Sequence, residues 1–324
     1  MKKIVIIDSN LGAIDLERNV AEQYGFLIDK PKQCKTEEDV ISVVKDADAV
    51  IVQYAPVTKR VLDASPNLKA VSEYGVGVDS IDIAACTERG IAVCNVPDYS
   101  FQEVSDQAIA LTLALDRGVV ALDKQIRSGN YGLAAVKPLH RIAGRVFGVV
   151  GLGRIARAAA HKACGLGYKV IGTDVAFEPG TTTDDGIPVV TFEELLSLSD
   201  VVSLHVPLTA GTKHLINAAA LSKMKPEAIL INTARGGVVD TEALVDALKN
   251  KTVRGAGLDV FETEPLPKDH PLTALDNVVL TPHAGYYSEE SLFELKTRPV
   301  QNAADVLAGK TPRNILNPVV LTLN

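Results

Sequence analysis

The 324-residue sequence contains no tryptophan, few other aromatic residues and only four cysteines. These cysteines, Cys34, Cys86, Cys94 and Cys164, form no C-x-x-C pair. In a chain of this length such cysteines are typical of reduced thiols in the core of a cytosolic protein. We therefore expect a cytoplasmic protein.

The sequence also lacks an excess of basic residues and any long apolar run. Its 33 Lys and Arg residues against 40 Asp and Glu residues give a net charge of −7, which argues against general nucleic-acid binding. No apolar run approaches the ~20 residues that span a bilayer. The opening stretch MKKIVIID holds too few apolar residues for a signal peptide. We expect a soluble intracellular protein with neither a nucleic-acid nor a membrane partner.

What the sequence does contain is a dinucleotide-binding pattern in residues 145–174, RVFGVVGLGRIARAAAHKACGLGYKVIGTD. A short apolar run ends in G-x-G-x-x-G/A, with Ala156 in the third place. Gly151 permits a tight turn, Gly153 lets a pyrophosphate approach the backbone, and Ala156 keeps the following helix close to the strand. A structural βαβ turn without a ligand is the alternative.

The same pattern carries a preference between cofactors. The helix that follows Gly153 presents backbone N–H groups and the positive end of its dipole to the phosphates. Asp174, at the end of the next strand, is placed to bind the ribose hydroxyls and to repel a 2′-phosphate. The sequence therefore predicts NAD(H) rather than NADP(H).

Apolar strand runs alternate with helices along the whole chain, which predicts parallel βα units. The expected strands are 3–7, 49–53, 70–72, 91–95, 147–150, 168–173, 188–190, 201–205, 229–232, 255–260 and 278–280. The expected helices begin at Thr36, Ile81, Ser100, Arg157, Thr191, Asp240 and Ser288. The first ~95 residues lack a nucleotide fingerprint and so predict a separate domain. The chain after His283 contains an expected helix and a tail that can pack against this first domain.

Several polar residues follow strands in the half that contains the fingerprint. They are Arg235, Asp259, Glu264 and His283, together with the segments His205-Val206-Pro207 and Thr233-Ala234. Ligands of open α/β sheets bind beyond the carboxyl ends of the strands, so we expect these residues to converge. A 2-hydroxyacid dehydrogenase needs an arginine for the carboxylate and carbonyl, a histidine for the proton and a carboxylate to orient the histidine. The alternatives are a surface histidine, a solvated glutamate in a turn, and an arginine that is a surface charge or binds phosphate.

A glycine-containing loop, Tyr74-Gly75-Val76-Gly77, follows an expected strand in the first half. Open backbone N–H groups in such a loop form a nest that suits a carboxylate. A plain turn is the equally compatible alternative.

The motifs together resemble the NAD-dependent D-2-hydroxyacid dehydrogenases over nearly the whole chain. They are YGVGVDSIDIAACTERGIAVCNVPDYS, GVVGLGRIARAAA, HVPLT, INTARGGVVD, GAGLDVFETEPLP and TPHAGYYSEES. The resemblance implies two doubly wound parallel-sheet domains. One is a flavodoxin-like substrate domain of residues 1–98 plus 286–324, and the other is a Rossmann NAD-binding domain of residues 99–285.

The resemblance also implies roles for residues. His283 is the acid/base, Glu264 is its partner, and Arg235 anchors the substrate, whose carboxylate the N–H groups of Val76 and Gly77 bind. The resemblance further implies cofactor contacts from Gly151, Gly153, Arg154, Ile155, Asp174, His205, Val206, Pro207, Thr233, Ala234 and Asp259. It implies NAD(H) as cofactor, a small 2-hydroxy or 2-keto acid as substrate, and a homodimer formed through residues 100–131. From the sequence alone, the polar segment 117–132 is equally compatible with crossing to a second subunit and with capping the sheet.

Two departures from the family bear on substrate and function. Glu73 stands where many members have arginine, which predicts that a phosphorylated substrate is disfavoured. The segment Tyr287-Ser288-Glu289 resembles the C-terminal-binding-protein branch, and Tyr286 stands where that branch often has tryptophan. The alternative to a dehydrogenase is therefore an NAD(H)-sensing recruitment module with weak or no dehydrogenase activity. No feature of the sequence predicts a metal site.

Overall fold

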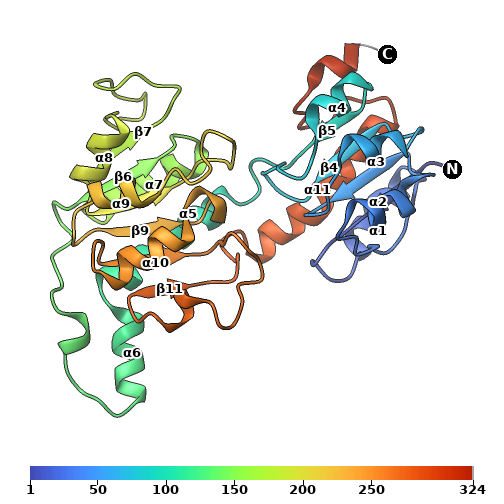
Figure 1. Cartoon of the computed structure of the whole chain (residues 1–324). Coiled ribbons are helices and arrows are strands. Elements are labelled where there is room, and N and C mark those ends of the chain that lie inside the picture. The colour runs from blue at the N-terminus through green and yellow to red at the C-terminus, as the bar shows by residue number, and fades with distance from the viewer. Residues whose placement is uncertain (323–324) are drawn as a thin grey trace. The chain divides into compact units, whose positions relative to one another are not determined.

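The chain folds around two separate parallel sheets (Figure 1). The structure is a computed structural model that describes residues 1–322. Unit 1 is Met1–Ser100 with Ser288–Asn324, and unit 2 is Phe101–Tyr287. These bounds differ by two residues from those expected from the sequence.

Unit 1 has a five-stranded sheet in the order β2-β1-β3-β4-β5. All its strand pairs are parallel, and 2-1-3-4-5 is the flavodoxin-like order. Its elements are β1 (Lys3–Ile6), α1 (Asp15–Gln23), β2 (Leu27–Ile28), α2 (Glu37–Val44), β3 (Ala49–Val52), α3 (Lys59–Asp63), β4 (Ala70–Glu73), α4 (Ile83–Glu88), β5 (Ala92–Cys94), α11 (Glu289–Leu307) and the 3-10 helix η4 (Pro318–Thr322).

Helices cover both faces of this sheet, which explains why its central strands are apolar without alternation. Helices α2, α3 and α4 pack on one face through residues such as Val40, Leu62 and Cys86. Helices α1 and α11 pack together, and α11 lies across β3, β4 and β5. The Thr36 side chain accepts a hydrogen bond from the Asp39 amide in a capping box, which confirms the predicted start of α2.

Unit 2 has a six-stranded parallel sheet in the order β11-β10-β9-β8-β6-β7. Its helices are α5 (Phe101–Asp116), α6 (Val119–Arg127), α7 (Arg154–Gly165), α8 (Phe192–Leu198), α9 (Ala218–Lys223) and α10 (Thr241–Lys249), with 3-10 helices η1 (Ala134–Val136), η2 (Gly236–Val238) and η3 (Pro271–Ala274). Its strands are β6 (Val146–Val150), β7 (Lys169–Thr173), β8 (Val201–Leu204), β9 (Ile229–Asn232), β10 (Gly255–Leu258) and β11 (Val278–Leu280).

The sheet of unit 2 also lies between two helical layers. Residues of α5 and α7 form one core with the strands, among them Leu111, Ala156 and Ala160. Helices α8, α9 and α10 form the other core. The strand order reverses between β6 and β8, and ligands of doubly wound sheets bind at such a switch point. The predicted fold class, two doubly wound parallel α/β sheets, is confirmed.

Two local expectations were wrong. Residues 188–190 form isolated bridges, from Pro188 to Thr182 and from Val189 to Gly172, instead of a strand. The chain turns at once into the capping box of Thr191 and Glu194, which leaves no length for a ladder. Cys164 is exposed, whereas the other three cysteines are buried, because the buried face of α7 is formed by alanines such as Ala160 and Ala163.

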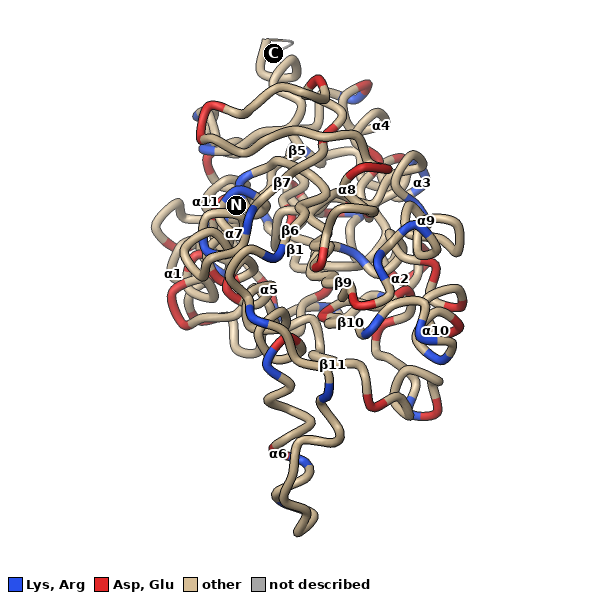
Figure 2. Tube along the Cα trace, turned by 90° about the vertical axis from the view of Figure 1, so that its left-hand side faces the viewer, with Lys and Arg blue, Asp and Glu red and all other residues tan. Residues whose placement is uncertain are grey.

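Helix α6 does not cap the sheet of unit 2. None of its nine residues is buried, and Figures 1 and 2 show α6 extending away from the sheet. Among residues 1–322 there is no helix with the length and apolar character needed to cross a membrane.

Candidate active site

The loops after β10 and β11 bring His283 and Glu264 together. His283 Nδ1 lies 2.7 Å from Glu264 Oε2. Glu264 Oε1 accepts a hydrogen bond of 2.9 Å from the Phe261 amide. Burial raises the pKa of Glu264, but the hydrogen bond and charge of His283, the Phe261 amide and the charge of Arg235 together leave that pKa below its ordinary value of 4.5. Glu264 is thus a carboxylate that holds the imidazole of His283 in place.

Arg235 lies at the carboxyl end of β9, close enough for its charge to lower the pKa of Glu264. A close approach of two loops explains this proximity. A Cβ atom on Gly236 would lie 1.9 Å from the backbone carbon of Phe261, so only glycine permits the contact. The structure therefore brings Arg235, Glu264 and His283 to one edge of the unit 2 sheet.

Asn232 holds the turn that contains Arg235, and the sequence analysis did not single it out. Its Oδ1 accepts from the Ala234 amide at 3.0 Å, and its Nδ2 donates to the Arg235 carbonyl at 2.9 Å. Asn232 is 1% exposed. An asparagine at the last position of a buried strand was the available signal, because a buried amide needs several partners.

Asp259 holds the loop that contains His283. Its Oδ1 accepts from the Thr281 hydroxyl at 2.5 Å and the Ala284 amide at 3.0 Å, and its Oδ2 accepts from the Gly285 amide at 2.8 Å. The His283 amide donates to the Asp259 carbonyl at 2.7 Å. This loop-holding role was not expected from the sequence, which suggested only a cofactor contact.

The loop after β6 fits a dinucleotide. Gly151 has φ +96°, and a Cβ atom there would lie 2.7 Å from the His205 carbonyl, so glycine is required. A Cβ on Gly153 would have no neighbour within 4 Å, so a ligand can approach this backbone. Gly153 precedes α7 without a side-chain cap, and Arg154 and Ile155 form the first turn, as a pyrophosphate site at a helix N-terminus requires.

Asp174 follows β7 and closes the other side of this loop. Its Oδ2 accepts from the Leu152 amide at 2.8 Å, and its Oδ1 accepts from the Ala176 amide at 2.9 Å. Val175 beside it is fully exposed. The carboxylate is therefore fixed next to the glycine loop, with an uncharged neighbour.

The segment after β8 lies at the same switch point, and the segment after β9 follows the next strand of the sheet. His205 Nε2 lies 2.9 Å from Ser203 Oγ, and desolvation lowers the pKa of His205 to about 4, so the ring is neutral at pH 7. Within residues 1–322, His205 Nδ1 and Thr233 Oγ1 are buried without a hydrogen-bond partner. Such atoms leave polar capacity for a ligand. Val206, Pro207 and Ala234 lie in these two segments.

Glu73, Val76 and Gly77 belong to unit 1. Glu73 is the last residue of β4 and is 2% exposed, whereas Val76 is partly exposed. The Val76 carbonyl accepts from Asn95 Nδ2 at 2.8 Å.

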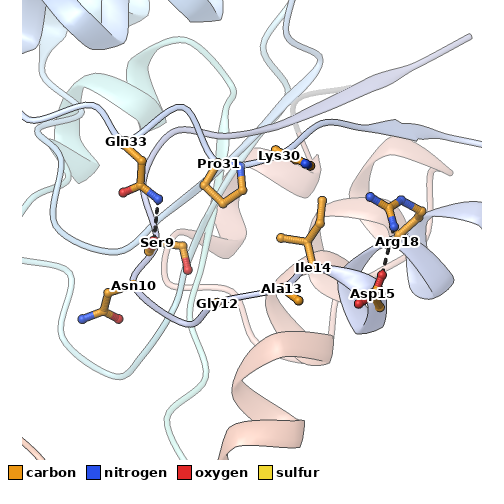
Figure 3. Close-up of a pocket in the computed structure, with 10 residues that line it drawn as sticks. All are labelled: Ser9, Asn10, Gly12, Ala13, Ile14, Asp15, Arg18, Lys30, Pro31 and Gln33. Carbon is orange, nitrogen blue, oxygen red and sulfur yellow. Dashed lines mark hydrogen bonds and ion pairs between the residues drawn. The ribbon is translucent and has the colours of Figure 1, made fainter.

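Unit 1 also contains a cavity of about 620 Å³ (Figure 3). Ser9, Asn10, Gly12, Ala13, Ile14, Asp15, Arg18, Lys30, Pro31 and Gln33 line it. Some of these lining residues interact with one another: the Gln33 side chain donates a hydrogen bond to the Ser9 carbonyl, and Arg18 forms an ion pair with Asp15. None of the expected site residues lines this cavity. The described part of the chain has no cluster of three or more His, Cys, Asp or Glu side chains suited to a metal ion.

Comparison with known proteins agrees with this arrangement. Residues 109–285 match the family described as D-isomer specific 2-hydroxyacid dehydrogenase, NAD binding domain. The chain is 39% identical over 306 residues to the glyoxylate reductase of Korarchaeum cryptofilum, with 93% of this chain and 92% of that protein covered.

Two solved structures have the same architecture over almost their whole length. One is D-lactate dehydrogenase from Aquifex aeolicus complexed with NAD and lactic acid, at 29% identity and a TM-score of 0.86, with 98% of this chain and 99% of that chain covered. The other is an acyclic imino acid reductase in complex with NADPH and D-Arg, at 32% identity and a TM-score of 0.87, with 97% and 99% covered. This chain therefore belongs to the D-isomer specific 2-hydroxyacid dehydrogenase family and is an NAD-dependent oxidoreductase of 2-hydroxy acids.

Proposed function

We propose that the enzyme reduces a small 2-keto acid to the D-2-hydroxy acid, with His283, Glu264 and Arg235 as its catalytic residues. The observation that carries this proposal is the 2.7 Å contact between His283 Nδ1 and Glu264 Oε2, beside an arginine whose charge reaches the same carboxylate. A histidine held in this way is suited to general acid/base work near neutral pH.

The three residues have different tasks in this proposal: Glu264 orients His283, His283 transfers the proton, and Arg235 binds the substrate. When bound, NADH supplies the hydride that reduces C2 of the keto acid. Because Nδ1 of His283 faces Glu264, Nε2 is the nitrogen that gives its proton to the keto oxygen, and it takes that proton back in the oxidation direction. The guanidinium of Arg235 binds the substrate and polarises the carbonyl. Asn232 and Asp259 keep the two loops in place.

The remaining predicted residues divide between cofactor and substrate. Gly151, Gly153, Arg154 and Ile155 receive the pyrophosphate, and Asp174 receives the adenosine ribose. His205, Val206, Pro207, Thr233 and Ala234 line the rest of the cofactor site, and Asp259 contacts the nicotinamide amide. The backbone N–H groups of Val76 and Gly77 bind the substrate carboxylate. Residues 1–98 with 286–324 thus act as the substrate domain, and 99–285 as the NAD-binding domain.

The substrate that we favour is glyoxylate or hydroxypyruvate, because the relative from Korarchaeum cryptofilum is a glyoxylate reductase and Glu73 disfavours a phosphorylated acid. We also propose that the enzyme is a cytoplasmic homodimer. Exposed apolar side chains on α6 and just after it, among them Val120, Ile126 and Tyr131, support dimerisation through this segment.

Oxidation of NADH in the presence of glyoxylate, hydroxypyruvate, pyruvate, phenylpyruvate and phosphohydroxypyruvate tests the function. We expect turnover with the small acids, and a fall in kcat of roughly 10²–10⁴ in His283→Asn, the usual contribution of a positioned acid/base. NADH binding by His283→Asn, measured by fluorescence titration, is expected to stay within about twofold of wild type. NADH binding without turnover of any acid would contradict the proposal and favour the NAD(H)-sensing recruitment module.

A further inference from the structure

A buried ion pair in unit 1 takes no part in the proposed chemistry. Glu17, on α1, is 1% exposed, and Lys296, on α11, is 7% exposed. Glu17 Oε2 lies 3.6 Å from Lys296 Nζ. Burial raises the pKa of Glu17, and the charge of Lys296 and the Tyr74 hydroxyl oppose this rise. Removing two charges from water is costly, and a buried pair is by itself weak evidence for stability. The pair therefore calls for another explanation.

Tyr74 connects the pair to the Tyr74–Gly77 loop. Its hydroxyl donates to Glu17 Oε1 at 3.2 Å, and its side chain is 4% exposed. Lys296 Nζ also donates to the Leu11 carbonyl at 3.3 Å and to the Ala13 carbonyl. Lys296 thereby ties α11 to the segment that leads into α1. The orientation of the Tyr74 ring thus depends on two helices distant in sequence.

A second chain of contacts from α11 holds the other part of the loop. The Val96 amide donates to the Gly75 carbonyl at 2.8 Å, and Asn95 Nδ2 donates to the Val76 carbonyl at 2.8 Å. Asn302, on α11 and 1% exposed, donates from Nδ2 to the Asn95 carbonyl at 3.2 Å. Helix α11 therefore reaches the loop through Lys296, Glu17 and Tyr74 on one side and through Asn302 and Asn95 on the other.

We propose that Glu17 and Lys296 are positioning residues that act through Tyr74 to fix the Tyr74–Gly77 loop for binding of the substrate carboxylate. This inference rests on the proposed function of that loop. A backbone nest binds an anion only when successive N–H groups point to one place. Preorganisation lowers the entropy that binding costs, so loosening Tyr74 weakens substrate binding rather than the chemistry.

Tyr74→Phe is the sharpest test, because it removes one hydroxyl and leaves the ring. Its control is Tyr24→Phe, since the Tyr24 hydroxyl donates to Asp305 on α11 at 2.6 Å and joins the same two helices away from the loop. We expect the KM for glyoxylate to rise about tenfold in Tyr74→Phe, as loss of a hydrogen bond to a charged group predicts. We expect kcat and the Kd of NADH to change by less than about threefold, and Tyr24→Phe to leave the KM unchanged.

Substitutions of the pair complete the test. Glu17→Ala and Lys296→Met are expected to raise the KM for glyoxylate as Tyr74→Phe does. Glu17→Gln keeps a hydrogen-bond acceptor for Tyr74, so its KM is expected to stay closer to that of wild type than the KM of Glu17→Ala. An unchanged KM in Tyr74→Phe and Glu17→Ala, even with a lower Tm, would overturn the positioning role. An equal rise in Tyr24→Phe would overturn it as well. Wild-type enzyme that reduces no 2-keto acid would overturn the proposed function instead, so the two failures are distinguishable.

Discussion

Glu264 performs two tasks through its two oxygens. Oε1 accepts the Phe261 amide, which fixes the carboxylate, and Oε2 faces His283. The lowered pKa of Glu264 means that the carboxylate stays ionised at and above its ordinary value of 4.5. The stabilising pairing with His283 is therefore present through the neutral range and is lost only as the pH falls through the folded-state pKa.

Glu264→Gln removes this charge at every pH. Protonated His283 then loses its stabilising partner, so we expect reduction to lose activity from a lower pH upward than in wild type. The measurement is kcat/KM for glyoxylate reduction between about pH 5 and 9, the range in which a histidine acid titrates. An unmoved profile would remove Glu264 from this role.

Asp174 determines the choice of cofactor in our interpretation. Its carboxylate is held by the Leu152 and Ala176 amides, and a 2′-phosphate would meet like charge there. We expect wild type to bind NADH more tightly than NADPH. We expect Asp174→Asn to lower the ratio of the Kd for NADPH to the Kd for NADH about tenfold, since one charge contact is worth about 1.4 kcal/mol or more. Dissociation constants of both cofactors, measured at one ionic strength, check this. The control is Asp184→Asn, which removes the charge of an exposed aspartate that pairs with Arg157. NADPH binding as tight as NADH in wild type would contradict it.

Glu73 bears on the substrate. It is buried at the end of β4, three residues before Val76 of the loop that we propose to bind the substrate carboxylate. Two unit charges ~6 Å apart at an effective dielectric near 20 repel by roughly 3 kcal/mol, so we expect glyoxylate and hydroxypyruvate to be better substrates than phosphohydroxypyruvate. The ratio of their kcat/KM values should move toward the phosphorylated acid in Glu73→Gln and further in Glu73→Arg. A ratio that both substitutions leave unchanged would show that Glu73 does not set substrate choice.

Helices and strands in unit 2 are joined by one buried carboxylate at the amino edge of the sheet. Asp116, the last residue of α5, accepts from Arg145 Nη1 at 2.8 Å, from Arg254, and from the Tyr168 hydroxyl at 2.5 Å. These partners directly precede β6, β10 and β7. Asp116 is fully buried, so its removal leaves two shielded guanidinium groups uncompensated.

We expect Asp116→Ala to destabilise unit 2 by about 3–5 kcal/mol, the usual effect of removing one partner from a buried charge cluster. At ~2–4 °C per kcal/mol for a domain of this size, the Tm should fall by roughly 6–20 °C. Differential scanning calorimetry measures this. The matched control is Glu193→Ala, which removes the exposed ion pair between Glu193 on α8 and Lys223 on α9 and should change stability by less than ~0.5 kcal/mol. Equal effects of the two substitutions would contradict the argument.

The elements that could be predicted from sequence are those with a strong local signal. Strands buried on both faces, such as β9, are continuous apolar runs, and the capping boxes at Thr36 and Thr191 mark two helix starts. Helix α1 was missed because its N-terminus has no side-chain cap. Helix α9 was missed although Asn217 caps it, because it is only six residues long.

The candidate site was predictable only in part, for a related reason. Arg235 and His283 follow strands, so the parallel topology alone places them at one edge. Asp259 was expected at this edge, but its role in holding the His283 loop and the role of Asn232 in holding the Arg235 turn depend on hydrogen bonds that the sequence does not specify. Glu17 and Lys296 are 279 positions apart in the sequence, and no local pattern connects them. The folded packing of α1 against α11 is what reveals their contact.

The whole molecule is expected to be a dimer that uses α6. Val119, Val120, Ile126, Tyr131 and Leu133 are each about half exposed or more, and Figure 2 shows this segment projecting from unit 2. Contiguous exposed apolar surface marks interaction sites. We expect light scattering to give twice the chain mass for wild type and the chain mass for Ile126→Asp with Tyr131→Asp. Leu198→Asp, on exposed α8 surface, should leave the mass unchanged, and a monomeric wild type would contradict the proposal.

The division of the chain into units has a consequence for synthesis. Unit 1 begins the chain, yet α11, which covers β3, β4 and β5, follows all of unit 2. On the ribosome, the part of the first sheet that α11 covers therefore stays exposed until α11 has been synthesised, whereas unit 2 is complete earlier. Domains generally fold as they are made, and exposed apolar surface invites aggregation. The strands that α11 covers are thus exposed on the nascent chain after unit 2 has been completed.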